Sequence, residues 1–153
     1  MISRIFYLWP LILIACACAD NREEIIDKSA LVIKTGTICG WCAQNDTLSI
    51  SGNMVRYVNY TNCSSANPSV TKTGQIESSK LDDLLGKLDV SELKKLDMNS
   101  CNVCFDGCDD WISYSNGTDS HYIRFTRNDP KLQHIQAFVD QLFAIKAQYT
   151  INK

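Results

Sequence analysis

The cysteines are the residues of this chain whose type and spacing could best do chemistry. Thiols that lie close together in an oxidising compartment form disulfide bonds, and we predict this chemistry first. The spacing alone does not choose which cysteines pair. The candidates for disulfide bonds are Cys39, Cys42, Cys63, Cys101, Cys104 and Cys108.

Two Cys-x-x-Cys pairs leave other chemistries open. The spacing of a four-thiolate zinc site is present in Cys39-x-x-Cys42 and Cys101-x-x-Cys104. The first pair also resembles the redox-active motif of thioredoxin-like proteins, but a strand is predicted after it, so no helix N-terminus would lower a thiol pKa. Free buried thiols are a further alternative. Because exported thiols are oxidised before they bind a metal, we expect no metal and no cofactor.

The other chemistry-bearing residues do not combine into a catalytic set. His121 and His134 are the two histidines. We predict a half-buried, hydrogen-bonded imidazole for His121 and a surface position for His134. The acidic residues of 106–110 lack the spacing of a calcium-binding loop, so we predict that they form a solvated acidic loop. With no Gly-x-Ser-x-Gly motif and no glycine-rich phosphate loop, we predict that the protein is not an enzyme.

Trp41 and Trp111 lie beside the two cysteine clusters. Packed against disulfides, they would belong to the core, and this is what we expect. Exposed, they would form a platform for a sugar or a peptide.

The N-terminus predicts export. Arg4 precedes about eleven mostly apolar residues, 5–15, which span roughly 16 Å as a helix. The bilayer core is about 30 Å thick, so the segment is too short to span it comfortably. A positive start followed by a short apolar run is typical of a signal peptide.

The end of this apolar run resembles the lipobox of bacterial lipoproteins. It reads Leu-Ile-Ala-Cys and ends at Cys16. The resemblance implies a signal peptide over 1–15, acylation of Cys16 with palmitate-type chains, and a polar tether over 16–29. The protein would then be anchored in the cell envelope, on the outer membrane or facing the periplasm. The alternative is cleavage after Ala19, which would give a secreted protein.

The charge balance narrows the range of partners. Fifteen lysines and arginines face 17 acidic residues, a formal charge of −2 at pH 7 without a basic run. Such a chain offers no electrostatic footprint for nucleic acid. We expect contact with a membrane through the lipid, and an unknown protein or glycan partner.

The hydrophobic pattern predicts a single α+β domain over 30–150. Alternating or β-branched runs predict strands, and Gly52-Asn53 and Asn116-Gly117 predict two hairpin turns. We expect an antiparallel sheet built from hairpins, with two helices packed on one face. The predicted strands cover 30–38, 46–51, 54–60, 70–76, 111–115 and 121–126.

Two apolar stripes predict the helices. One stripe begins at Leu81 and follows a cap at Ser79, and Ser91 is predicted to cap a further short turn. The other follows Asp129 as cap and Pro130 as first residue. We expect 97–110, which holds three of the cysteines, to be an irregular loop.

Over about residues 30–147 the chain resembles an uncharacterised family of small secreted or lipoprotein domains of bacteria. The resemblance implies the fold and export, and it implies no activity. Its matching pieces are Cys39, Gly40, Cys42, Tyr57, Tyr60, Gly74, Ile76, Leu84, Leu85 and Pro130.

The sequence therefore predicts an exported, lipid-anchored protein that is a non-enzymatic binding or structural module. A thiol–disulfide or metal-handling protein that uses the cysteine pairs is the alternative. A secreted enzyme inhibitor is a further alternative.

Overall fold

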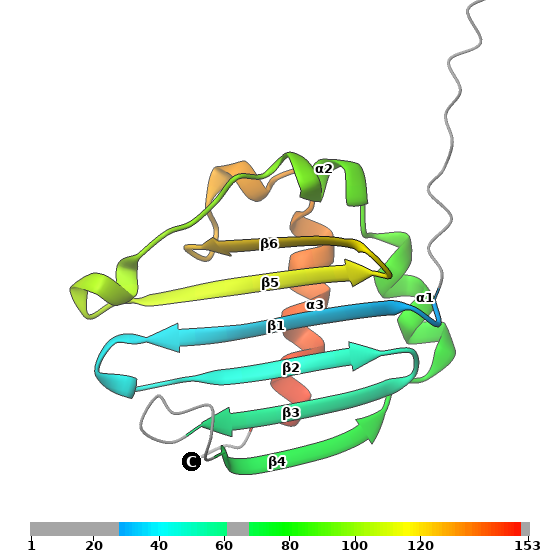
Figure 1. Cartoon of the computed structure of the whole chain (residues 1–153), viewed down its shortest axis with the longest axis horizontal. Helices are drawn as coiled ribbons and strands as arrows, with labels where there is room; N and C mark the ends of the chain where they lie inside the picture. Colours follow the sequence, from blue (N-terminus) through cyan, green and yellow to red (C-terminus); the bar gives the residue numbers. More distant parts are fainter. Residues whose placement is uncertain (1–27, 61–67, 151–153) are drawn as a thin grey trace, which may run out of the picture.

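The computed structural model describes residues 28–60 and 68–150. The predicted signal peptide, Cys16, all but the last two residues of the predicted tether, and Cys63 lie outside these residues. Within them, six strands form one antiparallel sheet in the order β4-β3-β2-β1-β5-β6 (Figure 1). The strands are β1 (Leu31–Cys39), β2 (Asp46–Ser51), β3 (Met54–Tyr60), β4 (Pro68–Gln75), β5 (Cys108–Asn116) and β6 (Asp119–Phe125).

The connections contain α-helices and short 3₁₀ turns. The α-helices are α1 (Ser78–Gly86), α2 (Val90–Lys95) and α3 (Gln136–Tyr149), and the 3₁₀ turns are η1 (Gly40–Cys42), η2 (Asn102–Phe105) and η3 (Pro130–Leu132). Helices and strands together confirm the predicted α+β class. None of the helices within 28–60 and 68–150 is long and apolar enough to cross a membrane.

Local turn chemistry explains both predicted hairpins. Gly52 and Gly117 have positive φ angles of 52° and 63°, which glycine adopts without steric cost. They join β2 to β3 and β5 to β6 in antiparallel register. The central strand β1 then pairs with β2 on one side and with β5 on the other.

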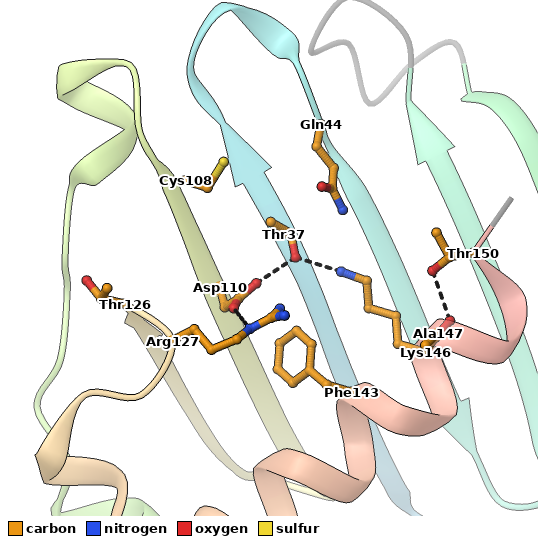
Figure 2. A pocket seen from close by; sticks show the side chains of 10 residues that line it. All are labelled: Thr37, Gln44, Cys108, Asp110, Thr126, Arg127, Phe143, Lys146, Ala147 and Thr150. Carbon is orange, nitrogen blue, oxygen red and sulfur yellow. Dashed lines mark hydrogen bonds and ion pairs between the residues drawn. The ribbon is translucent and has the colours of Figure 1, made fainter. Parts of the chain in front are cut away.

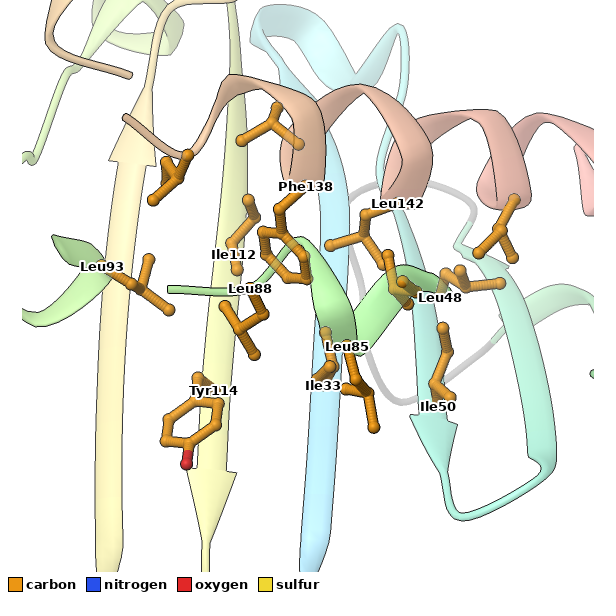
Figure 3. Packing of buried hydrophobic residues seen from close by; sticks show 14 of the residues in the cluster. Ile33, Leu48, Ile50, Leu85, Leu88, Leu93, Ile112, Tyr114, Phe138 and Leu142 are labelled. Atoms are coloured by element: carbon orange, nitrogen blue, oxygen red, sulfur yellow. The ribbon is translucent and has the colours of Figure 1, made fainter. Parts of the chain in front are cut away.

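The core lies between the sheet and the helices. α3 crosses the strands behind the sheet in Figure 1, and none of the helices formed by the described residues lies on the other face. Phe138 and Leu142 of α3 point toward the sheet, where Ile33, Leu48 and Ile112 are buried (Figure 3). Side chains alternate between the two faces of a strand, so one face is apolar and the other is solvated.

The helix starts differ from the predicted ones. α1 begins at Ser78, so Ser79 is inside the helix and is not its cap. α2 is capped by Asp89, whose side chain accepts a hydrogen bond from the backbone N–H of Glu92 at 2.9 Å, and not by Ser91. This start buries Val90 and turns the short predicted segment into a third α-helix.

The last helical segment has two parts. Asp129 caps it as predicted, with a 2.9 Å hydrogen bond from the N–H of Lys131, and Pro130 follows. The first turn is η3, and α3 begins only at Gln136.

The irregular loop predicted over 97–110 is shorter in the structure. β5 already begins at Cys108, because Cys108 pairs with Cys39 at the end of the β1–β5 ladder. Asp109 and Asp110 are therefore strand residues, and they point to opposite faces of the sheet.

Candidate functional site

Two disulfide bonds organise one end of the sheet. Cys39 at the end of β1 is bonded to Cys108 at the start of β5, 69 residues further along the chain. Cys101 is bonded to Cys104, three residues away, at the turn η2. The predicted disulfide chemistry is confirmed for these four cysteines. Cys63 and the side chain of Cys42 lie outside the described part of the structure.

The alternatives of a zinc site and of a redox-active Cys39–Cys42 pair need correction. A zinc site would need thiolates, but Cys39, Cys101 and Cys104 are in disulfide bonds. Cys39 is bonded to Cys108, so the alternative of a redox-active pair between Cys39 and Cys42 does not hold. The Cys-x-x-Cys pair that forms a disulfide within itself is Cys101–Cys104.

A buried ion pair lies beside the Cys39–Cys108 disulfide. Lys146 of α3 and Asp46 of β2 are 4% and 1% exposed, and Lys146 Nζ lies 2.5 Å from Asp46 Oδ1. Lys146 Nζ also donates to Thr37 Oγ1 at 2.7 Å. Burial lowers the pKa of Lys146 below its ordinary value, although the carboxylate of Asp46 acts in the opposite direction.

A second ion pair continues this network. The Thr37 hydroxyl donates to Asp110 Oδ1 at 2.6 Å, and Arg127 Nε donates to Asp110 Oδ2 at 2.7 Å. The Phe143 ring lies under both cations, with its centroid 4.7 Å from Arg127 Cζ and 5.3 Å from Lys146 Nζ. Figure 2 shows Thr37 hydrogen-bonded to Asp110 and to Lys146, one member of each ion pair.

These groups surround a cavity of about 460 Å³, a size that suits a small ligand or a partner's side chains. Gln44 Nε2 donates to Asp46 Oδ2 at 2.8 Å at its rim. Both cations are already paired with carboxylates, so the cavity offers polar and aromatic contacts with little net charge. Its lining residues are Thr37, Gln44, Cys108, Asp110, Thr126, Arg127, Phe143, Lys146, Ala147 and Thr150 (Figure 2).

Sequence reasoning missed this cavity. Asp46 is in phase with the buried Leu48 of its strand, and Asp110 is in phase with the buried Ile112. Alternation from these apolar positions could have placed both carboxylates on the covered face. Lys146 directly follows Ile145, which belongs to the apolar stripe of α3. This position on the helix could have indicated that Lys146 also faces the sheet.

Asp109 holds the cysteine-rich turn η2. Its carboxylate is fully buried and accepts hydrogen bonds from Ser100 Oγ at 2.6 Å, Asn102 N at 3.1 Å and Val103 N at 3.0 Å. Burial by itself raises the pKa of Asp109, but these hydrogen bonds outweigh it and hold the pKa below the ordinary value. No group of three histidine, cysteine or acidic side chains in 28–60 and 68–150 could hold a metal ion.

Two aromatic side chains project from the adjoining turns. Trp41 in η1 is 88% exposed and Phe105 in η2 is 87% exposed. The turns are joined by the Cys39–Cys108 disulfide and by a 2.9 Å hydrogen bond from Gly40 N to Gly107 O. We call Trp41, Phe105 and the turns η1 and η2 the aromatic tip.

The prediction that both tryptophans belong to the core is wrong, since neither Trp41 nor Trp111 is part of the core cluster. Trp41 is 88% exposed in the turn η1, and its φ is +52°. Trp111 is half-buried on the uncovered face of the sheet, against Gly36. A Cβ added at Gly36 would lie 2.7 Å from the indole ring of Trp111.

The histidine predictions are confirmed. His121 is half-buried with Nε2 2.9 Å from the carbonyl oxygen of Leu96, and His134 is exposed. Neither lines the cavity.

No protein-family model matches this chain, and no curated protein matches it either. The resemblance to small secreted and lipoprotein domains of bacteria therefore stays a prediction.

Proposed function

We propose that this chain is an exported, lipid-anchored envelope protein that acts as a non-enzymatic binding module. In this proposal Cys16 carries the lipid, and the aromatic tip with the adjoining cavity is the recognition surface. Two disulfide bonds are consistent with an oxidising compartment.

The exposure of the aromatic tip is the observation that carries the proposal. Trp41 and Phe105 are large apolar side chains exposed on two adjoining turns, and exposed apolar surface of this kind is used in interaction sites. Trp41 also has a left-handed backbone, which costs a residue with a Cβ about 1–3 kcal/mol. Its 88% exposed side chain gains little burial to offset this cost. Binding a partner would supply the missing burial.

The position of the tip favours a partner away from the anchoring membrane. β1 begins at Leu31, just after the predicted tether, and ends at Cys39, just before Trp41 (Figure 1). Nine residues of strand cover about 30 Å at roughly 3.3 Å per residue. The tip is therefore at the end of the sheet opposite to the chain's entry.

The chemistry of the cavity favours binding over catalysis. A general base needs a free position within hydrogen-bond reach of the substrate. Lys146 is 4% exposed, and its ammonium already contacts Asp46 and Thr37. Arg127 is 58% exposed and can contribute N–H groups to a ligand at the rim.

Site-specific photocrosslinking tests the proposal. A photoreactive amino acid replaces Trp41, Phe105 or the control residue Met54, which is 53% exposed at the other end of the sheet. In cells that export the protein, we expect one adduct of defined mass from positions 41 and 105 and none from position 54.

A double variant completes this test. Trp41→Ser with Phe105→Ser removes exposed side chains only, so its melting temperature should stay within a few degrees of the parent's. Adducts from a photoreactive residue at the exposed position Ala43, directly after the turn η1, should then disappear. Equal labelling from position 54, or no adduct from the tip, contradicts the proposal.

A further inference from the structure

We propose that the Cys101–Cys104 disulfide is a thiol–disulfide exchange site, opened by an external dithiol that attacks Cys104. The bond closes a ring of four residues in the aromatic tip. Cys104 is exposed, while Cys101 is half-buried. The co-reactant belongs to the class of small or protein dithiols.

Accessibility decides which sulfur is attacked. In thiol–disulfide exchange a thiolate attacks one sulfur and displaces the other, so the attacked sulfur must be open to solvent. Cys104 meets this condition, since the following residues Phe105 and Asp106 are exposed as well. The half-buried Cys101 is then the leaving group.

The second disulfide differs from the first in the burial of one sulfur and in the strand pairing around it. Cys108 is exposed, whereas Cys39 is 5% exposed, and the two are paired in a ladder that runs along the whole of β1 and β5. When this bond opens, the ladder still holds the two thiols together, so they re-form the bond. Attack at Cys108 would have to release a thiolate at the buried Cys39, and burial disfavours that charge, which separates the two bonds.

The turn η2 keeps its shape without the Cys101–Cys104 bond. The buried carboxylate of Asp109 fixes Asn102 N and Val103 N, and Gly107 N donates to the carbonyl oxygen of Asn102 at 2.8 Å. The Asn102 side chain donates to Thr126 Oγ1 at 2.7 Å. Reduction therefore leaves the two thiols near each other, ready to be oxidised again.

The nucleophile has to come from the co-reactant, because a disulfide bond contains no thiolate. The backbone N–H groups of Asn102 and Val103 bind Asp109, so they cannot stabilise a thiolate at Cys101. The dithiol co-reactant must supply the thiolate.

The exchange balances in two steps. The thiolate of the co-reactant bonds to Cys104 Sγ, the Cys101–Cys104 bond breaks, and Cys101 leaves as a thiolate that takes a proton from water. The second thiol of the co-reactant loses its proton, attacks the mixed disulfide and releases Cys104, which is protonated. The protein gains two electrons and two protons, and the co-reactant becomes a disulfide.

Differential alkylation of the purified mature protein tests the proposal. After equilibration with graded dithiothreitol, free thiols are alkylated and each cysteine peptide is read by mass spectrometry. We expect Cys101 and Cys104 to open together at a reductant concentration about tenfold or more below that for Cys39 and Cys108. Removal of the reductant should restore the same pair. If Cys39–Cys108 opens first or at the same concentration, or if the pairs scramble on reoxidation, the proposal is wrong.

Two variants test the direction of attack. Cys101→Ser leaves the exposed Cys104 thiol, and Cys104→Ser leaves the half-buried Cys101 thiol. With oxidised glutathione, we expect the first variant to form the mixed disulfide about tenfold faster than the second. Equal rates, or a faster second variant, would overturn the assignment of Cys104. The wild-type titration needs no variant, so it decides the main proposal even if a variant fails to fold.

Discussion

Among single residues, Lys146 has the most demanding environment. Its ammonium is nearly inaccessible, in contact with the equally buried Asp46, and next to the Phe143 ring. Removing charges from water is costly, and a buried pair is stable only when both partners are present. The pair therefore fixes how α3 sits on the sheet more than it adds to stability.

Lys146→Met should be strongly destabilising, by about 3–5 kcal/mol, because it leaves the Asp46 carboxylate buried without its cation. Urea unfolding measures the difference. The control is Lys72→Met on the exposed part of β4, which should change the free energy of unfolding by less than about 0.5 kcal/mol. Equal effects of the two variants would show that the buried pair is not needed.

Asp109 gives a pH-dependent prediction. Its folded pKa is lower than the ordinary value of 3.8, so the unfolded state takes up the proton first as the pH falls. The stabilisation is complete above the unfolded pKa and is lost as the pH falls through the lower folded pKa. Asp109→Asn should cost about 1–3 kcal/mol at pH 7, because buried N–H groups lose their anionic acceptor.

The difference between wild type and Asp109→Asn should therefore be constant from pH 7 to about pH 5 and shrink below the unfolded pKa. Urea unfolding at several pH values measures it. Asp106→Asn is the matched control in the same turn, since Asp106 is exposed and asparagine tolerates its left-handed φ of 62°. A constant difference down to pH 2 contradicts the role of the carboxylate.

At the scale of elements, two glycines report on how closely strands and helices approach their neighbours. An added Cβ at Gly36 in β1 would lie 2.0 Å from the carbonyl oxygen of Asp46 and 2.7 Å from the Trp111 ring. Gly86 at the end of α1 has open space around it. The same substitution should therefore have opposite signs at the two positions.

Gly36→Ala should destabilise the protein by about 1–3 kcal/mol or more, because strand backbone has to shift. Gly86→Ala should stabilise it by up to about 1 kcal/mol, because alanine has the higher helix propensity and nothing obstructs its methyl group. Thermal unfolding shows whether each variant is less or more stable than the wild type. A neutral Gly36→Ala would contradict the close β1–β2 packing.

The two disulfides should differ in their contribution to stability. By the chain-entropy relation, the bond that closes 69 residues between β1 and β5 stabilises by about 4 kcal/mol, and the one that spans three residues by about 2 kcal/mol or less. Cys39→Ser with Cys108→Ser should lower the unfolding free energy more than Cys101→Ser with Cys104→Ser. The reverse order in urea unfolding would mean that native-state contacts dominate.

At the scale of the whole molecule, the chain enters β1 at the end opposite to the aromatic tip, and the proposed anchor precedes that entry in the sequence. Cys16→Ala should abolish labelling by an alkyne analogue of palmitate and release the protein from membranes, because two acyl chains give stable anchoring. Cys18→Ala is the matched control and should keep both the label and the membrane fraction. A mature N-terminus at Asp20, found by mass spectrometry, would instead support secretion after cleavage at Ala19.

Much of the fold follows from local patterns in the sequence. The two hairpins depend on Gly52 and Gly117 between alternating runs, and the start of the last helical segment depends on Asp129 and Pro130. Turn chemistry and side-chain periodicity act over a few residues, so they can be read directly. The start of α2 was missed because Asp89 and Ser91 are both good caps, and the burial of Val90 chooses between them.

The partner of each cysteine and the candidate site were decided only by the tertiary structure. Cys39 meets Cys108 because β1 pairs with β5, and that register depends on the whole sheet. Thr37, Asp46 and Lys146 come from three elements and meet only where α3 crosses the strands. Sequence periodicity can place each residue on a face, whereas the contact between faces depends on long-range packing. The sequence by itself thus determined the elements and the disulfide chemistry, and packing decided the pairing, the charged cavity and the exposure of Trp41.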